Sequence, residues 1–270
     1  MGPDVTESGE LVRTCDVLGW DSAFFRYRIA RFRGSVCSSA DAAAIMRECT
    51  ADGIDCVYVL VDGSDTPSID ALLAHRAYLA DVRVTFGMEI RDMTGSAVDT
   101  GGGVRPGVVS EGGVRPAVAS DIPALKRIAA VSHRDTRFYA DKHFSPKDCD
   151  RLYQVWIEKS CQGYADAVFV AADDAGDPAG YVTCHRDEGH PAGETGRIGL
   201  FAVREDVRGR GLATRLLRAA RGWFSANRLT SMTVTTQVRN VRALQFYGRA
   251  GLVIRGVKFC FHFWPRDDSA

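Results

Sequence analysis

The sequence lacks an excess of either charge and lacks any long apolar run. Lysine plus arginine and aspartate plus glutamate number 34 each in the 270 residues, so the chain presents no net field to nucleic acid or to an anionic membrane. No uninterrupted apolar stretch approaches the roughly 20 residues that span a bilayer. We therefore expect a soluble protein with no nucleic-acid partner and no membrane partner, in which any anion site is local.

Motifs for disulfides, metals and nucleophilic catalysis are also missing. The eight cysteines include no CxxC pair and no secretory leader precedes them, so we expect reduced thiols in a cytoplasmic protein. The segment CHRDEGH (184–190) holds metal-ligating residue types, but they straddle a turn without the spacing of a metal site, so no metal is expected. No G-x-S-x-G elbow occurs, which argues against a serine nucleophile.

The chain does contain enough apolar material for a core, divided into two parts. Hydrophobic residues make up 46% of the sequence. The glycine-rich segment 92–113 has little to bury and predicts a linker between a small α/β domain, 1–91, and a larger domain, 114–270. In the small domain, apolar periodicity predicts two helices and one strand, at 41–49, 68–80 and 56–62.

The larger domain is predicted to have the element order β-α-α-β-β-β-α-β-α-β-β. Asn240 is expected to cap its last helix and Gly251 to end it. The final two strands are expected to form a hairpin that turns at Arg255 and Gly256.

The stretch FAVREDVRGRGLATRLLRAA (201–220) joins a predicted strand to a predicted helix through arginines and glycines. Such a loop presents backbone N–H groups and a positive dipole end to an anion. It is not a P-loop, because it contains no lysine, and Thr214 stands where a dinucleotide fingerprint needs its third glycine. From the residues alone, an arginine-rich solvated helix start is the alternative interpretation.

The pattern Arg208-x-x-Gly211-x-Ala213 after a strand resembles the pyrophosphate-binding loop of the GCN5-related N-acetyltransferase (GNAT) superfamily. The later helix also resembles its superfamily counterpart, at Asn240, Ala243, Tyr247 and Gly251. The resemblance implies an α/β (α+β) fold class, in which a GNAT fold with a mixed, mostly antiparallel central sheet follows the smaller α/β domain.

The same resemblance implies acetyl-CoA as cosubstrate. Backbone N–H groups of the loop would hold its pyrophosphate, and the preceding strand would run beside its pantetheine arm. The residues assigned to acetyl-CoA are Leu200, Phe201, Ala202, Val203, Arg208, Gly209, Arg210, Gly211, Leu212, Ala213, Thr214 and Asn240.

Tyr247 is predicted to be the general acid of the transfer. A phenol with an ordinary pKa of about 10 stays protonated at neutral pH and can give its proton to a departing thiolate. A core tyrosine is the alternative, since its helix neighbours are apolar. An N–H near Leu200 or Phe201 is the implied donor to the thioester carbonyl. No general base is assigned among the able side chains, which are Glu158, His185, His190 and Glu194.

The resemblance narrows to the TDP-fucosamine acetyltransferases through LGWDSAFFRYRIARF (18–32) and DTRFYADKHF (135–144). It implies acetylation of the amine of a TDP-linked deoxyamino sugar in a ternary complex, and it is compatible with a homodimer. The first block departs from that family at Arg26 and Tyr27, which leaves the acceptor open.

The acceptor site is predicted at Arg137, Phe138 and Tyr139, which combine a bidentate phosphate donor with two aromatic rings. Two other functions stay open. An acetyltransferase for an aminoglycoside or a free amino sugar would need an acidic groove for its cationic substrate. A non-catalytic CoA-binding sensor would not need Tyr247.

Overall fold

The computed structural model describes residues 14–34, 37–90, 113–187 and 195–265. The chain divides into two compact units: one comprises 1–83, 140–144 and 256–270, and the other 84–139 and 145–255. This division differs from the predicted boundaries, because the C-terminal segment groups with the N-terminal residues in unit 1. The predicted linker at 92–113 lies outside the described residues except for Gly113.

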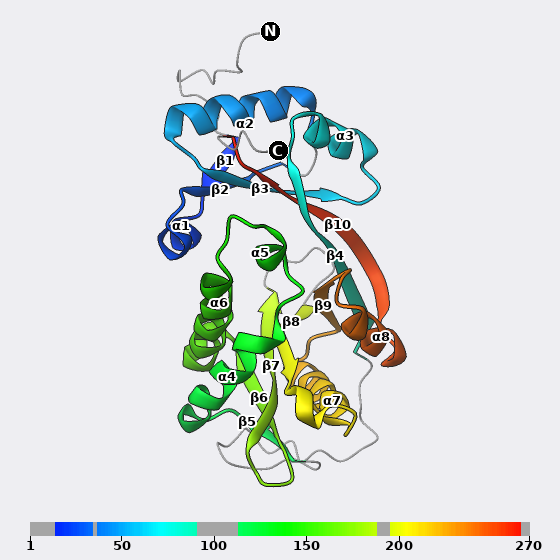
Figure 1. Ribbon diagram of the computed structural model, residues 1–270. Helices are drawn as coiled ribbons and strands as arrows, with labels where there is room; N and C mark the ends of the chain where they lie inside the picture. The colour runs from blue at the N-terminus through cyan, green and yellow to red at the C-terminus, as the bar shows by residue number, and fades with distance from the viewer. Residues whose placement is uncertain (1–13, 35–36, 91–112, 188–194, 266–270) are drawn as a thin grey trace. The chain divides into compact units, whose positions relative to one another are not determined.

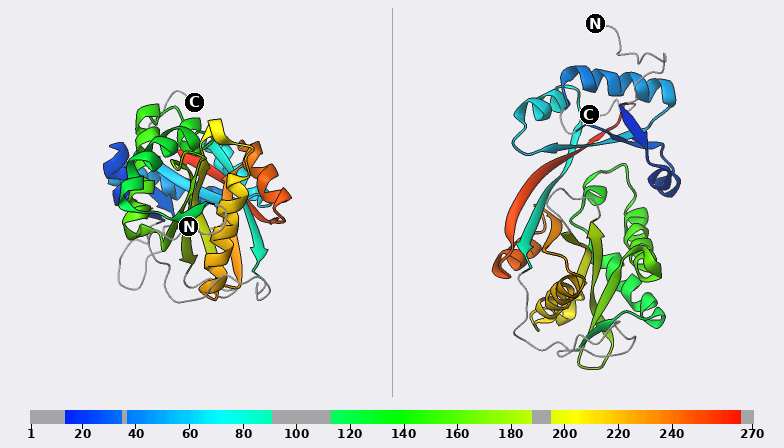
Figure 2. Two further views of the ribbon diagram at one scale, coloured as in Figure 1. Left: turned by 90° about the horizontal axis from the view of Figure 1, so that it is seen from below. Right: turned by 180° about the vertical axis from the view of Figure 1, so that it is seen from behind.

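Unit 1 is a small α/β unit. Its elements are β1 (Cys15–Val17), α1 (Gly19–Phe25), β2 (Ile29–Phe32), α2 (Ser39–Asp52), β3 (Cys56–Asp62), α3 (Thr66–Ala74), the first part of β4 (Tyr78–Glu89) and most of β10 (Val253–Phe263). The strand order is β1-β2-β3-β10-β4, with β2 and β3 parallel. Helices α2 and α3 cover one face of the strands (Figures 1 and 2), where Ile45, Val59 and Phe261 pack in one core.

Local sequence signals explain most of these elements. Helix α2 begins with a capping box, in which Ser38 and Asp41 each accept the other's backbone N–H. Strand β3 spans the predicted 56–62. The helix predicted at 68–80 is wrong in its last turns: it ends at Ala74, because Arg76 adopts a left-handed φ of 60° and the chain then enters β4.

Unit 2 contains a mixed, mostly antiparallel sheet, as predicted. Its remaining elements are β5 (Val114–Pro116), η1 (Ala119–Asp121), α4 (Ile122–Ser132), α5 (Arg137–Ala140), α6 (Pro146–Lys159), η2 (Ser160–Tyr164), β6 (Ala167–Ala172), β7 (Pro178–Asp187), β8 (Thr195–Val203), η3 (Glu205–Val207), α7 (Leu212–Ala226), β9 (Ser231–Gln237) and α8 (Val241–Arg249). The strand order is β4-β9-β8-β7-β6-β5. Only β8 and β9 are parallel among the described pairs from β5 to β9.

Helices cover both faces of this sheet (Figure 1). On one face, the hydroxyl of Tyr181 in β7 lies 2.9 Å from Nε2 of His133, which follows α4, and the His133 ring stacks on Tyr153 of α6. On the other face, Leu216 and Phe224 of α7 are fully buried in the main core. Successive side chains of a strand point to opposite faces, so Tyr181, Thr183 and His185 of β7 share the α4/α6 face.

The predicted C-terminal hairpin is wrong. Residues Val253–Phe263 form one strand, β10, and Gly256 does not have the positive φ that a tight hairpin turn needs. The strand pairs with β3 from Lys258–Asp62 to Phe263–Val57 instead of folding back on itself. Among the described residues, no helix is long and apolar enough to cross a membrane.

Candidate active site

Strands β8 and β9 pair at one end and part at the other. Their described pairs run from Thr195–Ser231 to Ile198–Val234, whereas β8 continues to Val203 paired with β7. A register shift in the β7–β8 pair lies between Val182 and Cys184, next to the point where β8 parts from β9. The backbone of β8 beyond Ile198 therefore has one edge that does not pair with β9.

The hydrogen bonds of β8 show which N–H groups face that edge. The N–H of Leu200 donates to Oγ1 of Thr183 (2.7 Å), and the N–H of Arg204 donates to the carbonyl of Ala179 (2.8 Å), so both face β7. Because N–H groups alternate along a strand, those of Phe201 and Val203 face the β9 side. Of the two predicted carbonyl donors, Leu200 is engaged with Thr183 and Phe201 is directed toward the β9 side.

The loop after β8 leads into the N-terminus of α7 with its backbone N–H groups available. Gly209 and Gly211 have left-handed φ values of 81° and 78°. Within the described residues, no N–H from Gly209 to Thr214 donates to a protein backbone oxygen. A Cβ at Gly209 would meet no atom within 4 Å, so the protein itself leaves space there. These N–H groups and the positive end of the α7 dipole fit a pyrophosphate.

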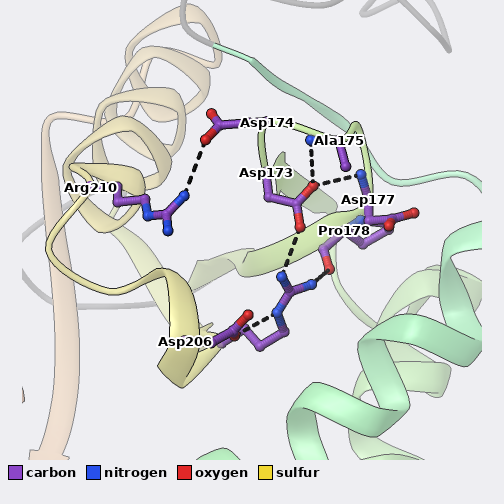
Figure 3. A network of polar contacts seen from close by, with 8 residues as sticks. Asp173, Asp174, Ala175, Asp177, Pro178, Asp206 and Arg210 are labelled. Carbon is purple, nitrogen blue, oxygen red and sulfur yellow. Dashed lines mark hydrogen bonds and ion pairs between the residues drawn. The ribbon is translucent and has the colours of Figure 1, made fainter.

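The arginine side chains near the loop bind the protein instead (Figure 3). Arg204 reaches Asp173 of the β6–β7 turn and Asp206, each at 2.7 Å. Arg210 pairs with Asp174 at 3.1 Å, and both side chains are exposed. Surface pairs of this kind contribute little stability, but the Arg204 pair ties the end of β8 to the β6–β7 turn. The loop geometry therefore favours anion binding by backbone groups.

Tyr247 lies on α8, whose N-terminus is capped as predicted. Oδ1 of Asn240 accepts the N–H of Ala243 at 3.1 Å, so this assigned residue serves the helix. The Tyr247 ring is 5.7 Å from that of Phe86 and 6.3 Å from that of Phe201. Burial raises the pKa of Tyr247 well above its ordinary value, so the phenol is protonated at neutral pH.

The predicted acceptor residues lie on the short helix α5. Phe138 is buried, with its ring 6.3 Å from that of Trp156, so its face is covered by the protein. The Arg137 guanidinium lies 4.7 Å from the Phe138 ring centroid, and the Tyr139 hydroxyl donates to Asp150. Phe138 therefore supports Arg137 instead of offering a free stacking surface.

The candidate bases are in different settings. Glu158 forms an ion pair with Lys126 at 2.6 Å. His185 lies in β7 on the α4/α6 face, and His190 and Glu194 lie outside the described residues. The described part of the chain holds no group of three His, Cys, Asp or Glu side chains arranged for a metal. Sequence reasoning missed Thr183, because its role depends on a cross-strand contact that no local motif signals.

Residues 129–252 match the acetyltransferase (GNAT) family. The unit in which β8 and β9 part therefore carries an acetyltransferase domain of the GNAT family.

Two known proteins are similar to the chain in sequence. It is 27% identical over 243 residues to dTDP-fucosamine acetyltransferase of Escherichia coli, covering 90% of this chain and 94% of that protein. It is 27% identical over 149 residues to the spore coat polysaccharide biosynthesis protein SpsD of Bacillus subtilis, covering 55% of this chain and 50% of that protein.

Solved structures share the fold. A GCN5-related N-acetyltransferase from Sphaerobacter thermophilus matches with a TM-score of 0.59 at 16% identity, covering 97% of this chain and 79% of the other. A protein from Staphylococcus epidermidis matches with a TM-score of 0.60 at 10% identity, covering 88% of this chain and 86% of the other. At these identities the likeness concerns the fold alone.

Proposed function

We propose that this protein transfers the acetyl group of acetyl-CoA to the amine of a TDP-linked amino-deoxy sugar, directly and within a ternary complex. The observation that carries the proposal is the similarity to dTDP-fucosamine acetyltransferase over 90% of the chain, because it includes the N-terminal unit as well as the GNAT domain. The geometry of β8, α7 and α8 supports it independently.

The N–H groups of the loop and of the α7 start, Gly209 to Thr214, would hold the pyrophosphate of acetyl-CoA. The N–H of Arg208, which the resemblance also assigns to it, donates to the carbonyl of Glu205 at 3.3 Å. The β9-facing edge of β8, from Leu200 to Val203, would hydrogen-bond its pantetheine arm as an added strand does. The N–H of Phe201 would donate to the thioester carbonyl, where negative charge grows during transfer. Acetyl-CoA supplies the activated acyl group, and the residues of the chain hold that group in position.

Tyr247 would give a proton to the departing sulfur. Its burial keeps the phenol protonated across the physiological pH range, which a proton donor requires. The same burial makes the phenol a weaker acid, so transfer has to be driven by a basic thiolate. The Phe201–Tyr247 ring contact supports placing this acid beside the proposed carbonyl donor.

Arg137 would bind the phosphates of the acceptor, with the Phe138 ring holding its guanidinium in place. Tyr139, the third residue predicted at the acceptor site, donates its hydroxyl proton to Asp150. A guanidinium held over an aromatic ring loses less side-chain entropy on binding than a free one. Cytoplasmic location and a homodimer stay predictions of the proposal. The eight free cysteines, seven of them buried, support the former, and light scattering would test the latter.

A thiol-release assay over a panel of acceptors tests the proposal. The panel holds TDP- and UDP-linked amino sugars, the free amino sugars and aminoglycosides. We expect efficient turnover of a TDP-linked amino sugar and weak turnover of its free sugar. Equal turnover of free and TDP-linked sugar would refute the nucleotide requirement. Activity on aminoglycosides alone would support an aminoglycoside acetyltransferase. Tight acetyl-CoA binding without any turnover would support a non-catalytic CoA-binding sensor.

A further inference from the structure

His185 lies directly beside the stretch of β8 where the strands part. The side chain is 7% exposed, and its Nε2 lies 3.4 Å from Oγ1 of Thr183. That same Oγ1 accepts the N–H of Leu200. The Thr183 oxygen keeps a second lone pair and its own proton, so it can accept from or donate to Nε2 and hold the ring in place in either tautomer.

Gly199 leaves the space that the imidazole uses. A Cβ at Gly199 would lie 2.5 Å from Nε2 of His185 and 2.8 Å from Oγ1 of Thr183. Contacts this short do not occur for real side chains, so the imidazole packs against bare backbone. Nε2 of His185 therefore lies over Gly199, the first residue of β8 beyond its pairs with β9.

His185 and Tyr247 lie on opposite faces of this part of β8. His185 shares the α4/α6 face with Thr183, whereas Phe201 contacts the ring of Tyr247 on the α8 side. Acyl transfer to an amine needs a proton acceptor for the entering nitrogen and a proton donor for the leaving sulfur. A candidate proton acceptor, His185, therefore lies on one face of β8, and a candidate proton donor, Tyr247, lies on the other face.

Burial is the main cause that lowers the pKa of His185, and the positive charge of Arg197 lowers it further. Arg197 pairs directly opposite His185 in the register and forms an ion pair with Asp187 at 2.8 Å. Asp187 and Asp166 raise the pKa of His185. The ring of Tyr164 in η2 lies 5.7 Å from the imidazole ring. With its pKa below the ordinary value, the imidazole is neutral at pH 7 and able to accept a proton.

We propose that His185 is the general base that removes a proton from the acceptor amine during acetyl transfer. The inference rests on the proposed acetyltransferase activity. As the amine forms the N–C bond and the C–S bond breaks, the nitrogen becomes acidic and gives one proton to the unprotonated ring nitrogen of His185. Tyr247 gives one proton to the departing sulfur. The imidazolium and the tyrosinate then return to neutral through solvent, so the protons balance.

Two variants of His185 test the role in the full-length protein, with a TDP-linked amino sugar as acceptor. We expect His185→Gln to lower kcat about 10²- to 10⁴-fold near neutral pH. The deficit shrinks as pH rises, because hydroxide then takes the proton from the attacking nitrogen in place of the imidazole. For His185→Ala, added imidazole restores part of the rate. His75→Gln, the same substitution at a histidine in unit 1, is the control and keeps full activity.

A readout without turnover separates this inference from the proposed function. The imidazole of His185, observed by NMR in the full-length protein, is expected to titrate below pH 6.5 and to shift when acetyl-CoA alone is added. Acetyl-CoA affinity in His185→Gln is expected to stay within about threefold of wild type. If the wild-type protein is inactive on TDP-linked sugars but still shows the NMR shift, only the assignment of the acceptor is overturned. An active wild type with an unshifted imidazole, or a His185→Gln variant with unchanged rates and pH profile, would overturn the base.

Discussion

At the residue scale, Gly211 carries the sharpest test of coenzyme binding. Its φ of 78° is unfavourable for other residues, and it is the N-cap of helix α7, next to N–H groups that donate to no backbone oxygen of the described residues. We expect Gly211→Glu to abolish acetyl-CoA binding, because it adds negative charge where the pyrophosphate binds. Isothermal titration calorimetry measures the effect. Arg218→Ala, further along α7, is the matched control, and unchanged affinity in the glycine variant would rule out this loop.

Tyr247 is the second test at this scale. Tyr247→Phe removes the hydroxyl and keeps the ring that contacts Phe86 and Phe201. We expect kcat to fall about 10²- to 10⁴-fold while acetyl-CoA affinity is nearly unchanged, because the proton is needed only in the transition state. Steady-state kinetics with calorimetry checks both quantities. Turnover close to wild type would leave Tyr247 with a packing role only.

At the element scale, the contact between β7 and β8 depends on Gly199. Gly199→Ala would place a methyl group 2.5 Å from Nε2 of His185, so the imidazole or the strand has to move. We expect a loss of kcat comparable to that of His185→Gln, with the protein still folded and acetyl-CoA still bound. Circular dichroism and kinetics together check this. Gly222→Ala, on α7 where a Cβ meets nothing within 4 Å, is the control.

Local signals predicted the elements better than the contacts between them. The Asn240 cap and Gly251 as the end of α8 follow from residue types, and the structure confirms both. The hairpin at Arg255–Gly256 was wrong, because a glycine in an extended run resembles a turn when its strand partner is unknown. The Thr183–Leu200 bond depends on the register shift between β7 and β8, which no local pattern encodes.

At the scale of the whole molecule, Asp141 is expected to set the acid stability of unit 1. Its carboxylate is 1% exposed and accepts hydrogen bonds from His262 at 2.6 Å, His143 at 2.7 Å and Trp264 at 2.9 Å. Burial alone would raise the pKa of Asp141. The hydrogen bonds from His262 and His143 together outweigh burial and hold this pKa far below its ordinary value. This segment joins α5 to α6 in the sequence, yet it belongs to unit 1.

Because the folded-state pKa is depressed, the stability that Asp141 contributes is complete above its unfolded pKa of about 4 and declines as pH falls below it. We expect Asp141→Asn to lower the free energy of unfolding by about 3 to 5 kcal/mol at neutral pH and to flatten its dependence on pH below about 4. Urea unfolding at several pH values measures both. Asp174→Asn is the control, since the Asp174 side chain is 93% exposed. An Asp141→Asn variant as stable as wild type would contradict this account.

The most direct test of the central claim is the mass of the product formed from a TDP-linked 4-amino-4,6-dideoxyhexose and acetyl-CoA. The account predicts one added acetyl group on the sugar nitrogen, one free thiol for each product molecule, and a higher kcat/KM than for the same amino sugar without its nucleotide. An unmodified nucleotide sugar after incubation, with acetyl-CoA bound but not consumed, would contradict it.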